Sequence, residues 1–365
     1  EQIRGKRDAC VAMVFKLLCT PPIKENWEAK VASMDASVTT LELDGTIPTA
    51  AADATWDGAF ITPEAFGLFK TKGVGALVVL YQALADLVTA GRVAWVHLCA
   101  SGVDVPFFFP LMAACHEKGV ALTHCPGVYG VPIAHYVLGH MLSTARMIAL
   151  HAENQAAKKY ESLIQRDLRA MTVGIVGAGG IGSEVARLSK GFGMTTIGWR
   201  RNAAPAPNYD EVLAGPDGLS TLLAKADFVV VCVPKTPATA GLLGAPQFAQ
   251  MKPTAWLINV SRGTVLDETA LIAALPIEGQ APAGAIMDVF AVEPLPQDSP
   301  LWGMPNVVIT PHDSWRTDEA LKDNHRYFLD NVALQMKGEP LIGLVADEYL
   351  SPAIAAAAAA KAAKM

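Results

Sequence analysis

From Met171 onward, short apolar runs alternate with longer stretches whose apolar residues recur with a helical period. Short apolar runs that end in Gly, Pro or polar residues are typical of buried parallel strands, which helices connect. The expected strands are 171–176, 195–199, 227–233, 255–260, 283–288 and 307–309, and the first expected helix is 181–192. This pattern predicts an α/β domain with helices on both faces of a parallel sheet.

The N-terminal third has the same rhythm, with expected strands at 12–18, 56–61, 93–98 and 120–124 and helices between them. The helical stretch 318–336 follows the last strand, and we expect it to pack back on this first domain. The final residues, 353–365, are nearly all Ala and Lys. A segment that buries so little apolar surface is expected to be a mobile tail.

Composition supports two globular domains. The 365 residues are 52% hydrophobic and 18% charged, which is enough apolar material for two ordinary cores. The formal net charge of −6 argues against nucleic acid as a partner. The six cysteines have neither a C-x-x-C spacing nor a Cys/His pattern, so we expect reduced thiols in an intracellular protein and no metal site.

One long stretch, 119–145, contains no Asp, Glu, Lys or Arg and raises the question of a membrane span. Two prolines, four glycines and three histidines interrupt this stretch. A buried strand, a turn and a buried helix fit it better than a transmembrane helix. We therefore expect no membrane partner.

A glycine-rich motif, Gly177-Ala-Gly179-Gly-Ile-Gly182, lies between an expected strand and an expected helix. The motif alone is weak evidence, but in this position it is typical of a Rossmann domain that binds a dinucleotide. Gly177 permits a tight turn, Gly179 lets the backbone approach a pyrophosphate, and Gly182 allows close packing of helix on strand. Gly180 directly precedes the expected helix and Ile181 begins it, and the free N–H groups of the helix would face the pyrophosphate. The alternative is a tight turn without a ligand.

The residues at the end of the second strand of that domain determine whether NAD(H) or NADP(H) binds. An acidic residue about 20 residues beyond the glycines would bind the ribose 2′-hydroxyl of NAD. Here Arg200 and Arg201 occupy that place. Guanidinium groups suit a 2′-phosphate, so we expect NADP(H) in preference to NAD(H). The alternative is a pair of solvated arginines on a loop.

Three chemically useful side chains, those of Arg262, Glu293 and His312, each come just after one of the last three apolar runs. Ligands of parallel sheets bind beyond the carboxyl ends of the strands. An arginine, a carboxylate and an acid–base residue are therefore expected to meet at one edge of the sheet. Taken singly, each has a bland alternative: a surface ion pair, a solvated loop acid or an ordinary turn histidine.

Further motifs extend this picture over most of the chain. They are Val-Ala-Trp-Val-His-Leu-Cys-Ala-Ser-Gly-Val-Asp at 93–104, Cys-Pro-Gly-Val-Tyr-Gly-Val-Pro-Ile-Ala at 125–134 and Val-Pro-Lys-Thr-Pro-Ala-Thr-Ala-Gly-Leu-Leu at 233–243. With nearly everything from 172 to 342, they resemble the D-isomer-specific 2-hydroxyacid dehydrogenases. That family includes glyoxylate/hydroxypyruvate reductases and phosphoglycerate dehydrogenases.

The resemblance implies a role for each of the three side chains. His312 would protonate the carbonyl oxygen during reduction and act as the base in reverse, which suits a histidine near neutral pH. Glu293 would hydrogen-bond the other ring nitrogen, and Arg262 would grip the substrate carboxylate and polarise the carbonyl. The hydride would come from the nicotinamide.

The resemblance also implies contacts to substrate and cofactor. Backbone N–H groups that would hold the substrate carboxylate belong to Ser101, Gly102 and Val103. The stretch that passes beneath the cofactor in the family contains Val233, Pro234 and Thr239. Asp288 is either structural or a contact of the nicotinamide amide. Trp315, shortly after His312, is a candidate wall of the substrate pocket.

Domain organisation and assembly follow from the motifs and the resemblance together. We expect two doubly wound α/β domains: a flavodoxin-like substrate (catalytic) domain at 1–124 plus 315–345, and an NAD(P)-binding Rossmann domain at 125–314, with a tail at 346–365. The apolar helix expected at 132–147 helps form a homodimer in the family, so we expect a homodimer. The family's usual Glu after Ala134 is His135 here, which leaves the local packing or inter-domain contacts open.

The leading functional hypothesis is the reduction of a small 2-oxo acid, such as glyoxylate or hydroxypyruvate, to a D-2-hydroxy acid with NADPH. The alternatives are an NAD(H)-sensing, corepressor-like binding protein and the NAD-dependent oxidation of a 2-hydroxy acid. A cytoplasmic enzyme is expected, and the C-terminal Ala-Lys-Met leaves a peroxisomal address as an alternative. Because the chain begins at Glu1, an N-terminal targeting segment stays open.

Overall fold

The computed structural model describes residues 14–20, 31, 33–34, 36–42, 45–51, 53–63, 74–275, 279–347, 349–351 and 354–356. Residues 12–13 of the first expected strand and the terminal Ala-Lys-Met lie outside the described residues. Contacts divide the chain into two compact units, unit 1 with residues 1–126 and 321–365 and unit 2 with residues 127–320. The functional roles assigned to the two domains stay predictions.

Unit 1 is built on a five-stranded parallel sheet in the order β2-β1-β3-β4-β5. Its strands are β1 (Phe15–Cys19), β2 (Ala36–Thr40), β3 (Gly58–Ile61), β4 (Trp95–Leu98) and β5 (Ala121–Thr123). This order is that of the flavodoxin-like doubly wound fold, which confirms the expected fold class. The apolar pattern does not predict β2, because this edge strand buries only Ala36.

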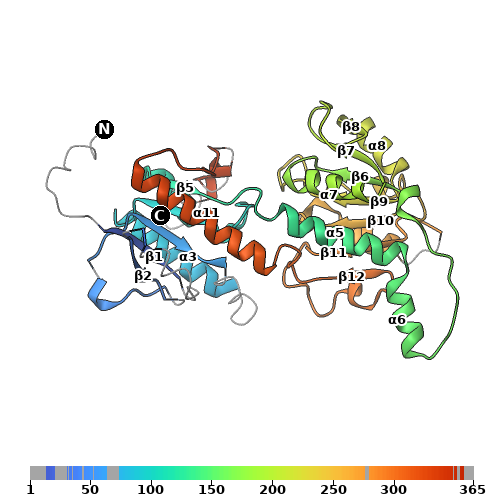
Figure 1. Ribbon diagram of the computed structural model, residues 1–365, viewed down its shortest axis with the longest axis horizontal. Coiled ribbons are helices and arrows are strands. Elements are labelled where there is room, and N and C mark those ends of the chain that lie inside the picture. Colours follow the sequence, from blue (N-terminus) through green and yellow to red (C-terminus); the bar gives the residue numbers. More distant parts are fainter. Residues whose placement is uncertain are drawn as a thin grey trace. The chain divides into compact units, whose positions relative to one another are not determined.

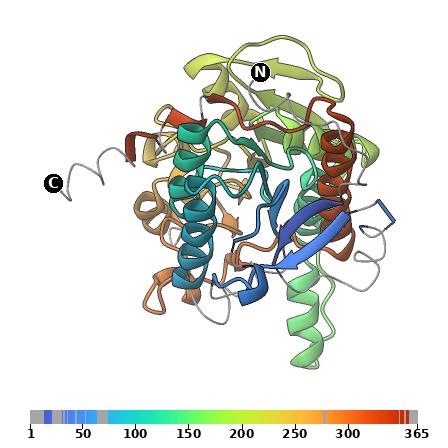
Figure 2. The ribbon, with the colours of Figure 1, turned by 90° about the vertical axis from the view of Figure 1, so that its left-hand side faces the viewer.

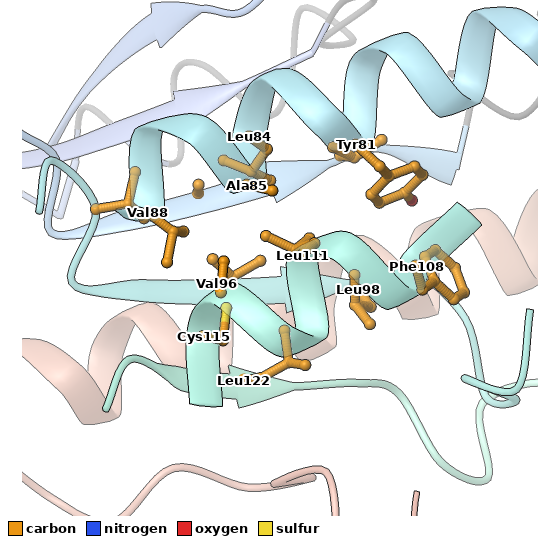
Figure 3. Packing of buried hydrophobic residues seen from close by; sticks show 14 of the residues in the cluster. Tyr81, Leu84, Ala85, Val88, Val96, Leu98, Phe108, Leu111, Cys115 and Leu122 are labelled. Carbon is orange, nitrogen blue, oxygen red and sulfur yellow. The ribbon is translucent and has the colours of Figure 1, made fainter. Parts of the chain in front are cut away.

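Helices cover both faces of the unit 1 sheet (Figure 2). They are α3 (Val74–Thr89), η3 (Pro106–Phe108) and α4 (Phe109–Lys118) on one face and α11 (Asp318–Lys337) on the other. Figure 3 shows Tyr81 of α3 turned toward Phe108, whose ring centroid lies 4.8 Å away. On the other face, Phe328 of α11 stacks on Phe60 at 4.3 Å. The helix α11 therefore packs against strands from the N-terminal third, as expected.

Unit 2 is built on a seven-stranded parallel sheet in the order β12-β11-β10-β9-β6-β7-β8 (Figure 1). Its strands are β6 (Thr172–Val176), β7 (Thr195–Trp199), β8 (Glu211–Leu213), β9 (Phe228–Val231), β10 (Trp256–Asn259), β11 (Gly284–Met287) and β12 (Val307–Ile309). Outward from β6, the order is that of the Rossmann fold with one further strand, and the strand order reverses between β6 and β9. Folds of this kind bind ligands at that reversal, beyond the carboxyl ends of the strands.

The helices of unit 2 connect these strands. They are α5 (Gly130–Ala145), α6 (Ile148–Ala156), η4 (Leu168–Ala170), α7 (Gly180–Gly191), α8 (Gly215–Lys225), α9 (Ala245–Phe248), η5 (Gly263–Val265), α10 (Glu268–Ala274) and η6 (Pro300–Gly303). A core of fully buried residues from β9, β10 and β11 lies beneath α8 and α10. Among the described residues, no helix is long and apolar enough to cross a membrane.

Candidate active site

The glycine motif forms the turn between β6 and α7, and two of its glycines are required by close packing. Gly177 has φ +116°, and a Cβ there would lie 2.7 Å from the carbonyl carbon of Cys232 and from the backbone nitrogen of Val233. A Cβ on Gly182 would lie 2.2 Å from the carbonyl oxygen of Gly177. The turn is therefore held against the end of β9 on one side and the first turn of α7 on the other.

The other two glycines of the motif face open space. A Cβ on Gly179 or Gly180 would meet nothing within 4 Å. Gly179 is the N-cap of α7, so the free N–H groups and the positive dipole end of a 12-residue helix point into that space. Space beside a helix N-terminus, reached without side chains in the way, fits a dinucleotide pyrophosphate.

The end of β7 has two guanidinium groups. The half-buried Arg200 donates from Nη2 to the carbonyl oxygens of Ala204 and Pro205, the latter at 3.4 Å. Its buried Nε has no hydrogen-bond partner among the described residues, and Arg201 is exposed. A ligand phosphate at this place would meet charge-assisted donors in place of the carboxylate that binds a ribose 2′-hydroxyl.

The loop after β9 is tied together by one hydroxyl. Thr239 Oγ1 donates to the carbonyl oxygen of Pro234 at 2.6 Å and accepts from the backbone N–H of Thr236 at 2.8 Å. Val233, at the start of this loop, is buried and lies next to Gly177 of the glycine turn. The expected contacts of Val233, Pro234 and Thr239 with the cofactor stay predictions.

The structure brings together Glu293 and His312, which follow the neighbouring strands β11 and β12. The Nδ1 atom of His312 lies 2.8 Å from Oε2 of Glu293. The other carboxylate oxygen of Glu293 accepts a hydrogen bond from the backbone N–H of Phe290 at 3.0 Å. With Nδ1 held by Glu293, Nε2 is the ring nitrogen left for a substrate oxygen.

Burial by itself would raise the pKa of Glu293, but the groups around it lower this pKa by more. The hydrogen bond and the charge of His312, the N–H of Phe290 and the positive charge of Arg262 hold the pKa of Glu293 below its usual value. The carboxylate therefore stays charged at neutral pH, where it can accept a hydrogen bond from Nδ1–H of His312. Arg262, which follows β10, acts on Glu293 through its charge, so all three expected side chains interact at one edge of the sheet.

A glycine missed by the sequence analysis, Gly263, holds the Arg262 segment against the Glu293 segment. A Cβ on Gly263 would lie 1.8 Å from the carbonyl carbon of Phe290 and 2.3 Å from the backbone nitrogen of Ala291. The two loops therefore touch backbone to backbone. The sequence contains this glycine directly after Arg262, but no local pattern shows what it packs against.

The loop that carries His312 is organised by the buried side chain of Asp288. Its Oδ1 accepts from Thr310 Oγ1 at 2.6 Å and from the backbone N–H of Asp313 at 3.0 Å, and its Oδ2 accepts from Ser314 Oγ at 2.5 Å. His312 itself has φ +52° in the left-handed region, which histidine adopts more readily than bulkier residues. Asp288 thus holds both sides of a turn that histidine occupies. The expected contact of Asp288 with the nicotinamide stays a prediction.

Comparison with known proteins identifies the family. The sequence model described as "D-isomer specific 2-hydroxyacid dehydrogenase, NAD binding domain" matches residues 138–314. The chain is 40% identical over 247 residues to "Glyoxylate/hydroxypyruvate reductase B" of Pectobacterium carotovorum subsp. carotovorum, an alignment that covers 66% of this chain and 76% of the relative. The chain belongs to the D-isomer specific 2-hydroxyacid dehydrogenase family.

Solved structures of this family support the assignment. A D-isomer specific 2-hydroxyacid dehydrogenase family protein from Aeromonas salmonicida is similar with a TM-score of 0.73 and 29% identity, over 92% of this chain and 99% of that one. A D-isomer specific 2-hydroxyacid dehydrogenase from Xanthobacter autotrophicus, solved with NADPH and MES, has a TM-score of 0.70 and 27% identity, over 92% and 98% of the two chains. This member of the D-isomer specific 2-hydroxyacid dehydrogenases is thus an oxidoreductase that uses a nicotinamide cofactor.

Two groups of expected substrate contacts stay predictions for this dehydrogenase. Trp315 lies beside the histidine loop, where its Nε1 donates to the carbonyl oxygen of His312 at 3.1 Å and its ring meets Tyr129 at 5.1 Å between centroids. In unit 1, the loop of Ser101, Gly102 and Val103 is tied down by Ser101 Oγ, which donates to the carbonyl oxygen of Cys125 at 2.8 Å. A tied loop is suited to present fixed backbone N–H groups.

Proposed function

We propose that this dehydrogenase reduces a small 2-oxo acid to the D-2-hydroxy acid, with NADPH as the hydride donor. The observation that carries the proposal is the 2.8 Å hydrogen bond between Glu293 and His312 at the sheet edge that also carries Arg262. An acid, its orienting carboxylate and a carboxylate-binding guanidinium are the groups that reduction of a 2-oxo acid requires from a protein.

In the proposed reaction each side chain acts at a stated atom. Arg262 pairs with the substrate carboxylate and polarises the carbonyl, and His312 donates the proton on Nε2 to the carbonyl oxygen as negative charge develops there. Glu293 holds Nδ1–H and stabilises the imidazolium before the transfer. When bound, NADPH supplies the hydride. In unit 1, the backbone N–H groups of residues 101–103 are proposed to hold the carboxylate.

The proposed substrates are glyoxylate and hydroxypyruvate. Support comes from the Pectobacterium relative, at 40% identity, which bears the name of a glyoxylate/hydroxypyruvate reductase. A guanidinium and a general acid recognise only the 2-oxo acid group that such substrates share. The side chain beyond that group is selected by packing, where one methylene is worth only about 1–3 kcal/mol.

The proposed preference for NADPH rests on Arg200 and Arg201 at the end of β7. Two positive side chains there suit a 2′-phosphate and provide no carboxylate for a free 2′-hydroxyl. The Xanthobacter family member with 27% identity was solved with NADPH, which favours the same choice.

The proposed function predicts NADPH oxidation by 2-oxo acids. We expect turnover with glyoxylate or hydroxypyruvate, and kcat/KM about 10-fold or more higher with NADPH than with NADH, because each charge-assisted contact to a phosphate adds about 1.5–3 kcal/mol. The measurement is the loss of reduced-nicotinamide absorbance with a panel that also contains pyruvate and phenylpyruvate. Faster turnover with NADH would contradict the proposal that Arg200 and Arg201 bind the 2′-phosphate. Cofactor binding without turnover of any acid would favour the corepressor-like alternative.

We also propose a homodimer, formed in part by α5, to which the family resemblance assigns this role, and in part by α6 and the segment that follows it. In that region Tyr160 is 108% and Ile164 95% exposed, which leaves large apolar side chains in water. Ile164→Asp is expected to shift the protein from dimer to monomer in gel filtration with light scattering. Val79→Asp, at an exposed position of α3 in unit 1, is the matched control and should leave the dimer intact. A monomeric parent protein would refute the proposal.

For location, we propose the cytoplasm. Relatives such as the Pectobacterium reductase are bacterial proteins, and this favours the cytoplasm over a peroxisome. The Ala-Lys-Met ending, on which the peroxisomal alternative depends, lies outside the described residues.

A further inference from the structure

We propose that Tyr136 of α5 is a positioning residue for His312, which it reaches through Thr310. The inference rests on the proposed function, in which His312 is the general acid. The observation is a hydrogen bond of 2.7 Å between the hydroxyl of Tyr136 and Oγ1 of Thr310. Thr310 precedes His312 by two residues, so a contact from α5 reaches the loop that carries the acid.

The direction of this hydrogen bond follows from proton counting. A threonine hydroxyl has one proton to donate. Thr310 donates that proton to Oδ1 of Asp288 at 2.6 Å. The hydroxyl of Tyr136 must therefore donate to Thr310, which makes a chain from Tyr136 through Thr310 to Asp288. Asp288 at its end also holds the backbone N–H of Asp313, on the other side of His312.

Tyr136 is well placed to hold its end of the chain still. It lies in a 16-residue helix, and its ring packs against that of His140 with centroids 4.4 Å apart. Burial raises the pKa of Tyr136, the hydrogen bond with Thr310 lowers it, and the negative charges of Asp288 and Asp313 raise it further, for a net rise above the usual value. The phenol therefore keeps its proton and remains a donor at working pH.

The loop has reason to need such an anchor. His312 is in the left-handed backbone region, with φ +52°, and 41% of its side chain is exposed, so few packing contacts fix the ring. Its ring must keep Nδ1 on Glu293 while Nε2 points at the substrate. Loss of one anchor would let the loop sample conformations in which that hydrogen bond is longer, which lowers the rate of proton transfer.

The test is Tyr136→Phe, which removes the hydroxyl and keeps the ring. We expect kcat to fall about three- to tenfold, in line with the loss of one neutral hydrogen bond, with the KM for NADPH unchanged. Tyr349→Phe is the matched control, since Tyr349 packs against the apolar core of unit 1. A kcat within 1.5-fold of the parent in Tyr136→Phe would overturn the proposal, and so would a fall that comes entirely from the KM for NADPH.

A double variant tests whether Tyr136 acts through Thr310. Thr310→Val removes the hydroxyl that links Tyr136 to Asp288, and it is expected to lower kcat at least as much as Tyr136→Phe does. If the chain is real, adding Tyr136→Phe to Thr310→Val lowers kcat no further. Additive falls in kcat would contradict the route through Thr310.

A readout without turnover separates this inference from the proposed function. The ring resonance of His312 can be assigned in the cofactor-free protein by its loss in His312→Gln. We expect Tyr136→Phe to shift and broaden this resonance and Tyr349→Phe to leave it unchanged. A resonance identical in all three proteins would refute the positioning role, whereas failure of every 2-oxo acid as a substrate would refute only the proposed function.

Discussion

His312→Gln is expected to lower kcat about 10²- to 10⁴-fold for any 2-oxo acid that the parent enzyme reduces. The physical reason is that glutamine keeps a hydrogen-bonding amide near Glu293 but cannot transfer a proton to the alkoxide that forms on hydride transfer. The 2.8 Å contact with Glu293 leaves Nε2 as the donor, and the variant has no equivalent of that atom. Steady-state kinetics under saturating NADPH measure the loss.

Two controls show whether the loss of kcat in His312→Gln arises in the chemical step. NADPH binding, followed by fluorescence, and the melting temperature are expected to stay close to those of the parent, because the His312 side chain is 41% exposed. The matched variant His116→Gln, at an exposed position of α4, should keep full activity. A His312→Gln enzyme that retains more than about a tenth of the parent kcat would show that another group supplies the proton.

Gly263→Ala is expected to lower kcat/KM about 100-fold and to destabilise the fold by roughly 1–3 kcal/mol or more. The new Cβ would lie 1.8 Å from the carbonyl carbon of Phe290 and 2.1 Å from its oxygen. Neither atom belongs to a flexible side chain, so the two backbones must separate. Their separation would carry Arg262 away from Glu293, whose loop begins beside Phe290. Kinetics and urea unfolding measure the two effects.

The control for Gly263→Ala is Gly75→Ala in α3. A Cβ on Gly75 would meet nothing within 4 Å, and alanine favours a helix over glycine. This variant should be as stable as the parent or slightly more stable, with unchanged kinetics. Parent-like activity and stability in Gly263→Ala would mean that the loops of Arg262 and Glu293 can move apart without loss of stability or activity. The close backbone contact at Gly263 would then not explain how the two side chains are positioned.

The fold could be predicted from the sequence wherever strands are buried on both faces. β9 is a continuous apolar run in the sequence, and β6 and β10 are nearly so, because helices cover them on both sides. The short edge strands β2 and β8 could not be found in this way. β2 has two threonines and buries only its first residue, while the three residues of β8 are all only partly buried. An edge strand is held by its neighbour's hydrogen bonds, for which sequence patterns carry little signal.

The candidate site also contains residues that could be predicted from the sequence and residues that could not. Arg262, Glu293 and His312 could be placed together from the sequence, because the carboxyl ends of parallel strands meet at one edge. The contact between Tyr136 and Thr310 joins residues that are 174 positions apart, so no local pattern predicts it. The role of Gly263 cannot be predicted from the sequence either, since it depends on the backbone of Phe290 packing against this glycine. The groups that react follow from topology, whereas those that hold them follow from tertiary packing.

In the proposed reaction, hydride passes from NADPH to the carbonyl carbon of a 2-oxo acid while His312 protonates the oxygen. The most direct measurement uses NADPH with deuterium at C4 of the nicotinamide, in each of its two configurations, with glyoxylate and hydroxypyruvate. Mass spectrometry and chiral chromatography then analyse the product. We predict a 2-hydroxy acid that carries one deuterium at C2 from one of the two labelled cofactors, with the D configuration when hydroxypyruvate is the substrate. A product without deuterium from either cofactor, or L-glycerate from hydroxypyruvate, would contradict the account.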